Sequence, residues 1–313
     1  MALLDGTWVT EGGLETDLIF NHGVDLPDFA AFPLLETPEG VALLRSYYAG
    51  FTAIAGSCGA GVLFETPTWR ASPEWGRRLG YDQAGLDRAN RAAVELIRAV
   101  LEEADVAGRR ISGCVGPRGD AYLATGADAD AAAEYHLPQI RCLAEAGADL
   151  VHAMTMIDTA EAVGAVRAAR SAGIPVSISF TVETDGRLPD GRTIAEAIQA
   201  VDDAAPADFY GLNCVHPAHV LAALDGGAWQ ERLTFFRPNA STLSHAELDA
   251  MDELDAGDIP LLVDLTGDLL AQLPAVTVLG GCCGTDTRHV AALWSSRATR
   301  AEGPDQPPRS QAR

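Results

Sequence analysis

Short apolar segments rich in β-branched residues alternate along the chain with longer stretches whose hydrophobic residues recur at helical spacing. Runs of this length that are bounded by turn residues are typical of buried strands. Eight such segments are predicted strands: Thr7–Thr10, Gly61–Glu65, Ile111–Val115, Leu150–Thr155, Val176–Thr181, Phe209–Asn213, Leu233–Phe236 and Val276–Leu279.

A strand followed by a helix, repeated eight times, predicts a parallel sheet covered by helices and suits a single closed (β/α)8 barrel of the TIM type. The predicted helix Ala131–Ala146 shows the pattern of one unit. Between Phe236 and Val276 the chain is longer than one unit needs, and it predicts helices at His245–Leu254 and Leu265–Leu273. A doubly wound sheet is the alternative, which the absence of GxGxxG after the first strand disfavours.

No linker rich in glycine, serine or proline divides the chain, so residues 1–300 are predicted to form one barrel domain. The segment Ala301–Arg313 contains three prolines, one glycine and no large apolar side chain. Such a segment cannot bury enough surface to offset its ordering entropy, and we predict a disordered C-terminal tail.

The charge of the chain excludes several partners and chemistries. Its 44 acidic and 22 basic residues leave a net charge of -22, which disfavours binding to nucleic acid or to an anionic membrane. Every basic residue is arginine, so a lysine Schiff base, a pyridoxal aldimine and a P-loop lysine are excluded. The sequence shows neither a transmembrane run nor a secretory signal, and we expect a cytoplasmic protein.

Cysteines follow two of the predicted strands, in the segments Phe209–Cys214 and Val278–Gly284. The C-terminal ends of barrel strands are where ligands and catalytic groups gather. Successive strand residues point to opposite faces, so Cys282 and Cys283 can converge only where the chain turns. The glycines around them permit that turn.

Cys214, Cys282 and Cys283 would then lie on the same rim of the barrel and could share one metal ion. Catalytic zinc typically has three protein ligands and an open position, at which a substrate thiol would be deprotonated. Ordinary buried cysteines and a Cys282–Cys283 disulfide are the alternatives. The other cysteines are expected to be structural: Cys58, Cys114 and Cys142.

The two cysteine motifs are GLNC at Gly211–Cys214 and GGCCGT at Gly280–Thr285. Five further motifs accompany them at Glu11–Thr16, Thr66–Ser72, Gly116–Gly119, Ala146–Asp149 and Ile178–Thr181. Together these motifs resemble the homocysteine S-methyltransferase family over almost all of the chain. The resemblance implies a (β/α)8 barrel with Zn²⁺ on the three rim cysteines. It also implies methyl transfer from a sulfonium or ammonium donor to homocysteine, giving methionine, or to a related thiol.

The resemblance further implies substrate-binding residues at Glu11, Thr66, Thr68, Met154 and Asn213. Two of these depart from the family pattern, in which Asp stands at the place of Glu11 and Glu at the place of Met154. Both family acids help to hold the amino group of homocysteine. The departures therefore put homocysteine itself in question as the acceptor, unless another acid replaces the lost one. Glu65 and Glu183 are candidates at neighbouring strand ends.

An onium donor would be held by aromatic faces and carboxylates, for which Trp8, Trp69, Tyr122 and Phe180 are candidates. Arg118 could bind a substrate carboxylate. No catalytic residue beyond the metal site is predicted, since transfer to a metal-bound thiol needs no general base.

His216 and His219 are expected to begin a helix rather than to bind metal. Two other interpretations stay open, a zinc hydrolase and a non-enzymatic barrel with a structural zinc. The sequence leaves open whether the donor is S-methylmethionine, S-adenosylmethionine, betaine or another compound. It also leaves open the oligomeric state.

Overall fold

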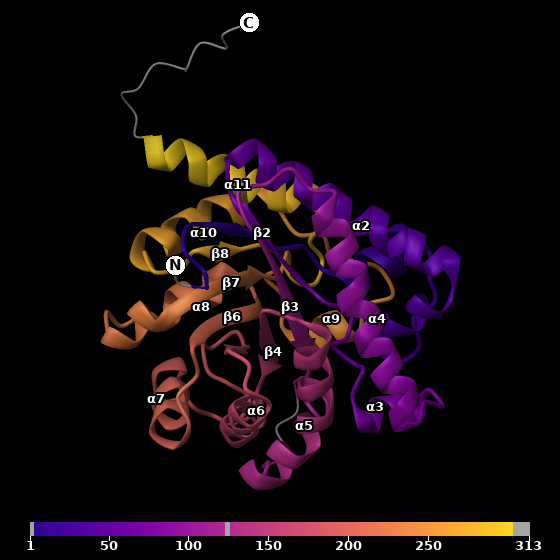
Figure 1. Cartoon of the computed structure of the whole chain (residues 1–313). Helices are drawn as coiled ribbons and strands as arrows, with labels where there is room; N and C mark the ends of the chain where they lie inside the picture. The colour runs from indigo at the N-terminus through magenta and orange to yellow at the C-terminus, as the bar shows by residue number, and fades with distance from the viewer. Residues whose placement is uncertain (1–2, 123–125, 303–313) are drawn as a thin grey trace, which may run out of the picture.

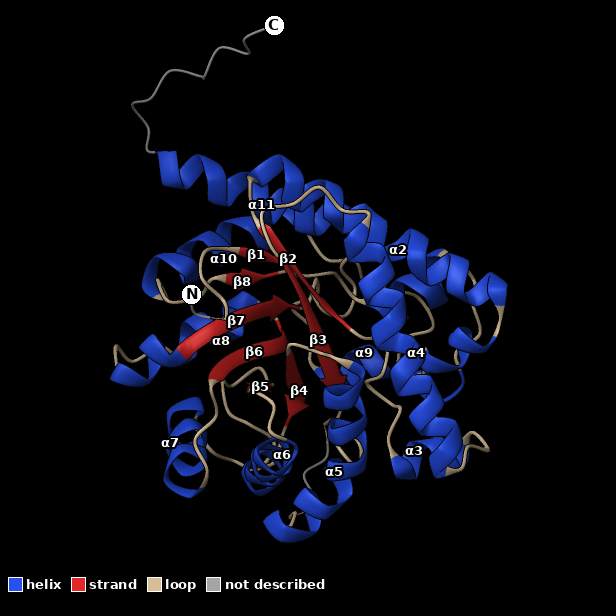
Figure 2. Cartoon of the chain, viewed as in Figure 1, coloured by secondary structure: helices blue, strands red, loops and turns tan. Residues whose placement is uncertain are grey.

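Eight parallel strands pair in sequence order and close into a barrel, because β1 pairs with both β2 and β8. The computed structural model describes residues 3–122 and 126–302. Figures 1 and 2 show the strands at the centre of the molecule with helices around them. The strands are β1 Trp8–Val9, β2 Gly61–Glu65, β3 Arg109–Val115, β4 Leu150–Met156, β5 Val176–Phe180, β6 Phe209–Val215, β7 Leu233–Pro238 and β8 Val278–Leu279.

Helices connect successive strands and cover the outside of the barrel (Figure 2). They are α1 Leu14–Thr16, α2 Pro38–Cys58, α3 Pro73–Arg78, α4 Gln83–Glu102, α5 Ala129–Ala146, α6 Thr159–Ala172, α7 Ile194–Ala204, α8 Pro217–Ala223, α9 His245–Asp249, α10 Ile259–Gln272 and α11 Thr287–Glu302. Short π or 3₁₀ turns occupy Asp17–Asn21, Pro27–Phe29, Phe32–Glu36 and Ala228–Arg232.

The predicted barrel is confirmed, and every predicted strand overlaps an observed one. The long connection between β7 and β8 differs from the prediction in its helix bounds. Helix α9 ends at Asp249, five residues before the predicted end. Helix α10 begins at Ile259, before the predicted Leu265, because Asp258 caps the N–H of Leu261 and a proline occupies the first turn.

The C-terminal helix α11 continues through residue 302, two residues into the predicted tail. The remainder of that tail, residues 303–313, lies outside the described residues, so the division into barrel and tail stays a prediction. Within residues 3–122 and 126–302, no helix combines the length and apolar character needed to cross a membrane.

The inside of the barrel changes from apolar to polar along the strand direction. Leucine, phenylalanine and valine side chains of several strands pack with Trp8 in one apolar cluster. Two positions later on the same strands, buried polar residues replace them: Glu65 follows Leu63 on β2, His152 follows Leu150 on β4, and Arg237 follows Phe235 on β7. The C-terminal end of the barrel interior therefore carries polar and charged side chains above an apolar base.

Candidate metal and substrate site

Three cysteine thiols meet at the C-terminal end of the barrel. Cys214 is the penultimate residue of β6, and Cys282 and Cys283 follow β8. The sulfur of Cys214 lies 3.1 Å from that of Cys282 and 3.4 Å from that of Cys283. All three sulfur atoms lie within 4.8 Å of one another. The predicted convergence of the two cysteine segments is thus present in the structure.

The loop after β8 turns tightly enough to bring two consecutive cysteines together. A Cβ atom on Gly281 would lie 2.0 Å from Oγ1 of Thr285, so no side chain fits there. The N–H of Cys282 donates to the carbonyl of Pro238 on β7, and the carbonyl of Cys283 accepts from Ala240. These bonds fix the loop against the end of the neighbouring strand.

The ends of β4 and β6 adopt unusual backbone conformations beside the thiols. Thr155 and Cys214 have φ values of 60° and 57°, in the left-handed region that side chains rarely adopt. Asn213 exchanges hydrogen bonds with the N–H and hydroxyl of Thr155, at 2.7 and 2.8 Å. Its amide nitrogen also lies 3.7 Å from the sulfur of Cys282. Asn213 therefore holds this strained rim together.

The three thiols cannot all ionise without a cation. Hydrogen bonds from Cys214 and Cys283 lower the pKa of Cys282 well below its usual value of 9.0. Hydrogen bonds with Cys214 and Cys282 raise the pKa of Cys283, so that one thiol loses its proton at the expense of its neighbour. Burial raises the pKa of Tyr122, which keeps its hydroxyl protonated 3.4 Å from the sulfur of Cys214. Three converging sulfur ligands suit a soft divalent metal such as zinc.

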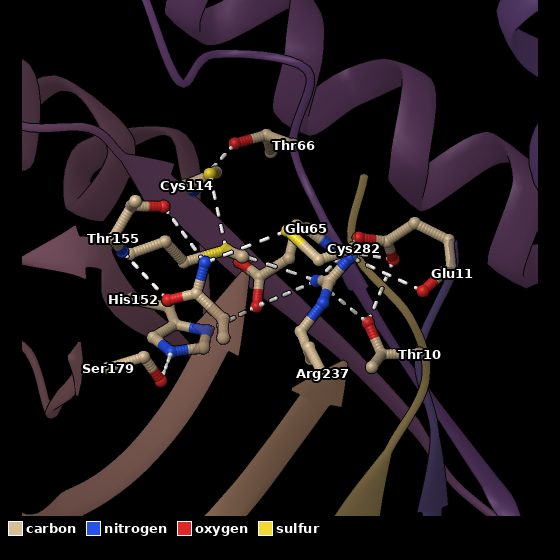
Figure 3. A network of polar contacts seen from close by, with 12 residues as sticks. Thr10, Glu11, Glu65, Thr66, Cys114, His152, Thr155, Ser179, Arg237 and Cys282 are labelled. Carbon is tan, nitrogen blue, oxygen red and sulfur yellow. Dashed lines mark hydrogen bonds and ion pairs between the residues drawn. The ribbon is translucent and has the colours of Figure 1, made fainter. Parts of the chain in front are cut away.

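Arg237 lies beside the thiols, between two buried carboxylates (Figure 3). Its Nη1 lies 2.7 Å from Oε1 of Glu11 and 3.7 Å from Oε1 of Glu65. Burial alone would lower the pKa of Arg237, but the two carboxylates more than offset burial and raise it. From Glu65 the network continues through His152 to Ser179, with two contacts of 2.6 Å. This network joins β2, β4, β5 and β7 below the thiols.

A cavity of about 400 Å³ opens above the three thiols. Its buried wall includes Glu11, Glu65, Thr66, Met154 and Arg237. Its outer part is more apolar and includes the exposed side chains of Phe20 and Met251 as well as the rings of Phe29, Trp69 and Tyr122. The cavity thus joins the thiols to solvent through an aromatic mouth.

The five predicted substrate-binding residues fall into two groups. Glu11, Thr66 and Met154 line the cavity. Thr68 is fully buried behind it, where its hydroxyl contacts that of Thr66 and donates to the carbonyl of Cys114. Asn213 is also fully buried and bonds to the rim, as described above. Direct contact with substrate stays a prediction for the first group, whereas the second group supports the wall.

The candidates for donor binding also separate. Trp69 and Tyr122 line the cavity. Phe180 is fully buried and stacks on Tyr210, and Trp8 belongs to the apolar base of the barrel. The sequence pattern placed all four near strand ends. The direction in which each side chain points decides whether it lines the cavity or packs in the core, and the sequence does not give that direction.

Three charged or titratable candidates lie away from the cavity. Arg118 pairs with Glu74 at 3.3 Å, with both side chains about half exposed. His216 caps α8 and accepts from the N–H of Ala218, as expected for a residue at the start of a helix. Glu183 contacts His245 at 3.0 Å. None of the three lines the main cavity among the described residues.

Several charged residues of the cavity were missed by sequence reasoning, among them Arg237 and Glu15. Arg237 could have been noticed as a charge inside the apolar strand Leu233–Pro238. Glu15 lies in the first helical turn after β1, and desolvation by the surrounding protein raises its pKa from 4.5 to about 7. Part of the Glu15 side chain stays exposed, and it faces the cavity.

Comparison with known proteins decides the family. The model of the homocysteine S-methyltransferase family matches residues 8–296. The chain belongs to this family. It is a methyltransferase, as the resemblance of its motifs implied.

Relatives of the homocysteine S-methyltransferase family match most of the chain. The homocysteine S-methyltransferase of Escherichia coli (strain K12) is 29% identical over 319 residues, which cover 93% of both proteins. Homocysteine S-methyltransferase YbgG of Bacillus subtilis (strain 168) is 26% identical over 241 residues, which cover 69% of this chain and 72% of YbgG. The crystal structure of the E. coli homocysteine methyltransferase MmuM in its metallated form superimposes with a TM-score of 0.72 and 22% identity, covering 93% of this chain and 96% of MmuM. That likeness supports the barrel fold.

Proposed function

We propose that the chain transfers a methyl group from a sulfonium or quaternary ammonium donor to a thiol bound at a zinc ion on Cys214, Cys282 and Cys283. The acceptor would be homocysteine, giving methionine, or a related thiol. The observation that carries this proposal is the convergence of three thiols at the inner end of a 400 Å³ cavity. A cytoplasmic location accompanies the proposal as an expectation from the sequence.

The donor set fits zinc. When bound, zinc would act as a Lewis acid that keeps an added substrate thiol deprotonated near neutral pH. Support also comes from MmuM, whose crystal structure is described as a metallated form.

The geometry favours an open metal position over a closed structural site. Among the described residues, the metal-binding group contains three cysteines and no fourth cysteine, histidine or carboxylate. A structural zinc would need a fourth protein ligand. Hydrolytic zinc sites usually include histidine and carboxylate ligands, so the all-cysteine set also disfavours a hydrolase.

The outer part of the cavity suits a cationic donor. Among the described residues, the charged lining of the whole cavity is mostly acidic, with Arg70 and Arg237 as its arginines. Outside the buried wall, the lining carboxylates are Glu15, Asp120, Asp249, Glu253 and Asp255. Together with the aromatic rings at the mouth, these acids would attract a sulfonium or ammonium group.

The reaction requires little from the protein beyond positioning. The acceptor sulfur, as a thiolate, forms a bond to the methyl carbon while the bond between that carbon and the onium centre breaks. The donor leaves as a neutral sulfide or tertiary amine, and no proton moves in this step. The cavity walls hold donor and acceptor in line and exclude water.

A methyl-transfer assay with the zinc-loaded protein tests this proposal. S-methylmethionine, S-adenosylmethionine and glycine betaine would each be combined with homocysteine and with thiols that lack its amino group, and the methylated thiol would be measured by mass spectrometry. We expect at least one pair to give a product, and Cys214→Ser to abolish its formation. A protein that holds one zinc per chain and methylates no thiol of the panel would overturn the proposal.

A further inference from the structure

Arg237 supplies a buried positive charge beside the thiols. Its side chain and that of Glu11 are each only 4% exposed, and the two groups are 2.7 Å apart. Glu65 lies on the other side of the guanidinium, at 3.7 Å. The position between these two carboxylates, where a substrate cation would be most strongly attracted, is therefore filled by the protein itself (Figure 3).

The guanidinium is saturated with protein acceptors. Nε donates to the carbonyl of Gly281, and Nη1 donates to the hydroxyl of Thr10 as well as to Glu11. Nη2 lies 3.3 Å from the carbonyls of Glu11 and Gly12. These contacts use all five N–H groups of an arginine. Arg237 therefore acts as a fixed charge and has no donor left for a substrate carboxylate.

The Glu11 carboxylate is also engaged on both of its oxygens. Its Oε1 accepts from Arg237, and its Oε2 accepts from the Thr10 hydroxyl at 2.9 Å and from the N–H of Glu65 at 3.2 Å. An incoming ammonium group would have to share this carboxylate with Arg237 or displace one of these bonds. Displacing the ion pair would leave a buried arginine without its counterion, which is strongly unfavourable.

Met154 completes this side of the cavity with an apolar surface. Its sulfur lies 3.9 Å from Nη1 of Arg237 and 3.7 Å from the sulfur of Cys114. A substrate group packed on Met154 therefore lies close to the guanidinium. A neutral group is accepted there, whereas an ammonium group would have to compete with the guanidinium for the carboxylate of Glu11.

We propose that the acceptor is a thiol without an ammonium group near its sulfur, with Arg237 occupying the place of the missing cation. This inference rests on the proposed function, because it concerns the thiol that binds at the three cysteines. The competing possibility is Glu65, whose Oε2 is buried without a hydrogen-bond partner and whose side chain lines the cavity. An ammonium group bound there would make homocysteine the preferred acceptor.

Equilibrium binding of two thiols to the wild-type, zinc-loaded protein decides between these possibilities. Homocysteine and 4-mercaptobutyrate share the same carbon chain, thiol and carboxylate, and they differ in the amino group. Isothermal titration calorimetry would give both dissociation constants without a methyl donor. We expect 4-mercaptobutyrate to bind more tightly, by about tenfold or more. Equal binding, or tighter binding of homocysteine, overturns the inference.

Substitutions then test which residue causes the preference between the two thiols. Arg237→Gln should raise the affinity for homocysteine relative to 4-mercaptobutyrate by about tenfold, and Arg237→Lys, which keeps the charge, should leave the ratio near that of wild type. Glu65→Gln should leave the wild-type ratio unchanged. If Glu65→Gln selectively weakens homocysteine binding, Glu65 holds the amine and the inference is wrong.

Removing a buried charge can prevent folding, so zinc content and circular dichroism accompany each variant. The double variant Glu11→Gln with Arg237→Gln removes both charges of the ion pair. It lacks the Glu11 carboxylate that Arg237→Gln leaves without a counterion. Its affinity for homocysteine relative to 4-mercaptobutyrate should therefore be lower than that of Arg237→Gln. If neither variant folds, the wild-type comparison and Glu65→Gln still decide. If neither thiol binds the zinc-loaded protein, the proposed function itself fails. If both bind and homocysteine binds more tightly, only this inference fails.

Discussion

Thr155 and Asn213 exchange two hydrogen bonds across the ends of β4 and β6, at 2.7 and 2.8 Å, and both side chains are buried. The pair links a strained backbone position to the thiol of Cys282, which lies 3.7 Å from the Asn213 amide nitrogen. Backbone geometry at one strand end thus positions Cys282, a candidate metal ligand that follows another strand.

Replacing Asn213 by alanine should weaken metal binding without removing a ligand. The buried N–H of Thr155 would lose its acceptor, which costs about 1–3 kcal/mol of unfolding free energy. Loss of such a supporting partner typically weakens metal affinity by about 10- to 100-fold. Chelator competition and urea denaturation measure the two effects. The exposed Asn21, replaced by alanine, serves as the control and should change neither; unchanged zinc affinity in Asn213→Ala would contradict the role assigned here.

The three rim cysteines should each be essential for zinc. Purified protein is expected to hold about one zinc per chain, and Cys214→Ser, Cys282→Ser and Cys283→Ser should each lose most of it. Cys142→Ser is the matched control, because the Cys142 thiol lies elsewhere and contacts the carbonyl of Asp87. Plasma mass spectrometry measures the metal. Full zinc occupancy in all three rim variants would remove the cysteine site from consideration.

Gly13 is expected to be sensitive to the addition of a single methyl group. A Cβ atom there would lie 2.5 Å from the carbonyl oxygen of Cys282, so Gly13→Ala must displace the cysteine loop. Such overpacking costs about 1–3 kcal/mol of unfolding free energy, and we expect weaker zinc binding as well. Gly119→Ala is the control, since a Cβ atom at Gly119 meets nothing within 4 Å. Equal zinc affinity in the two variants would show that the loop adapts.

The barrel was predictable from the sequence because its signal is local and repeated. Each strand is a short apolar run, and a four-residue motif places Cys214 at the end of β6. The ion pair of Arg237 was not predictable, because Arg237 and Glu11 are 226 residues apart and meet only when the barrel closes.

Glu15 should make donor binding depend on pH. Desolvation raises its pKa from 4.5 to about 7, so the carboxylate that attracts a cation forms as the pH rises through about 7. The KM for a cationic donor should therefore fall from pH 6 to pH 8. Glu15→Gln should flatten this dependence, whereas Glu39→Gln, at an exposed position on α2, should keep it.

The same shift predicts the effect of Glu15 on stability. A carboxyl group whose pKa is raised on folding stabilises the folded state fully below pH 4.5, and this contribution is lost as the pH rises through about 7. Urea denaturation at several pH values should show a smaller loss of stability over this range for Glu15→Gln than for wild type. An identical pH profile in both proteins would contradict the raised pKa.

Met154→Glu should shift acceptor preference toward homocysteine. The Met154 sulfur lies 3.9 Å from Arg237, so a carboxylate at this position would supply a further acceptor for an ammonium group beside the guanidinium that already pairs with Glu11. One added charge-assisted hydrogen bond is worth about 1.5–3 kcal/mol, or roughly ten- to a hundredfold in the ratio of kcat/KM for homocysteine to that for 4-mercaptobutyrate.

Met154→Gln has nearly the same shape as Met154→Glu without the charge and should change the ratio little. Burial resists ionisation of the new carboxyl group, but the adjacent arginine favours it. Zinc content should equal that of wild type in both variants, because residue 154 is not a ligand. An equal shift in Met154→Glu and Met154→Gln would show that shape, and not charge, sets the preference.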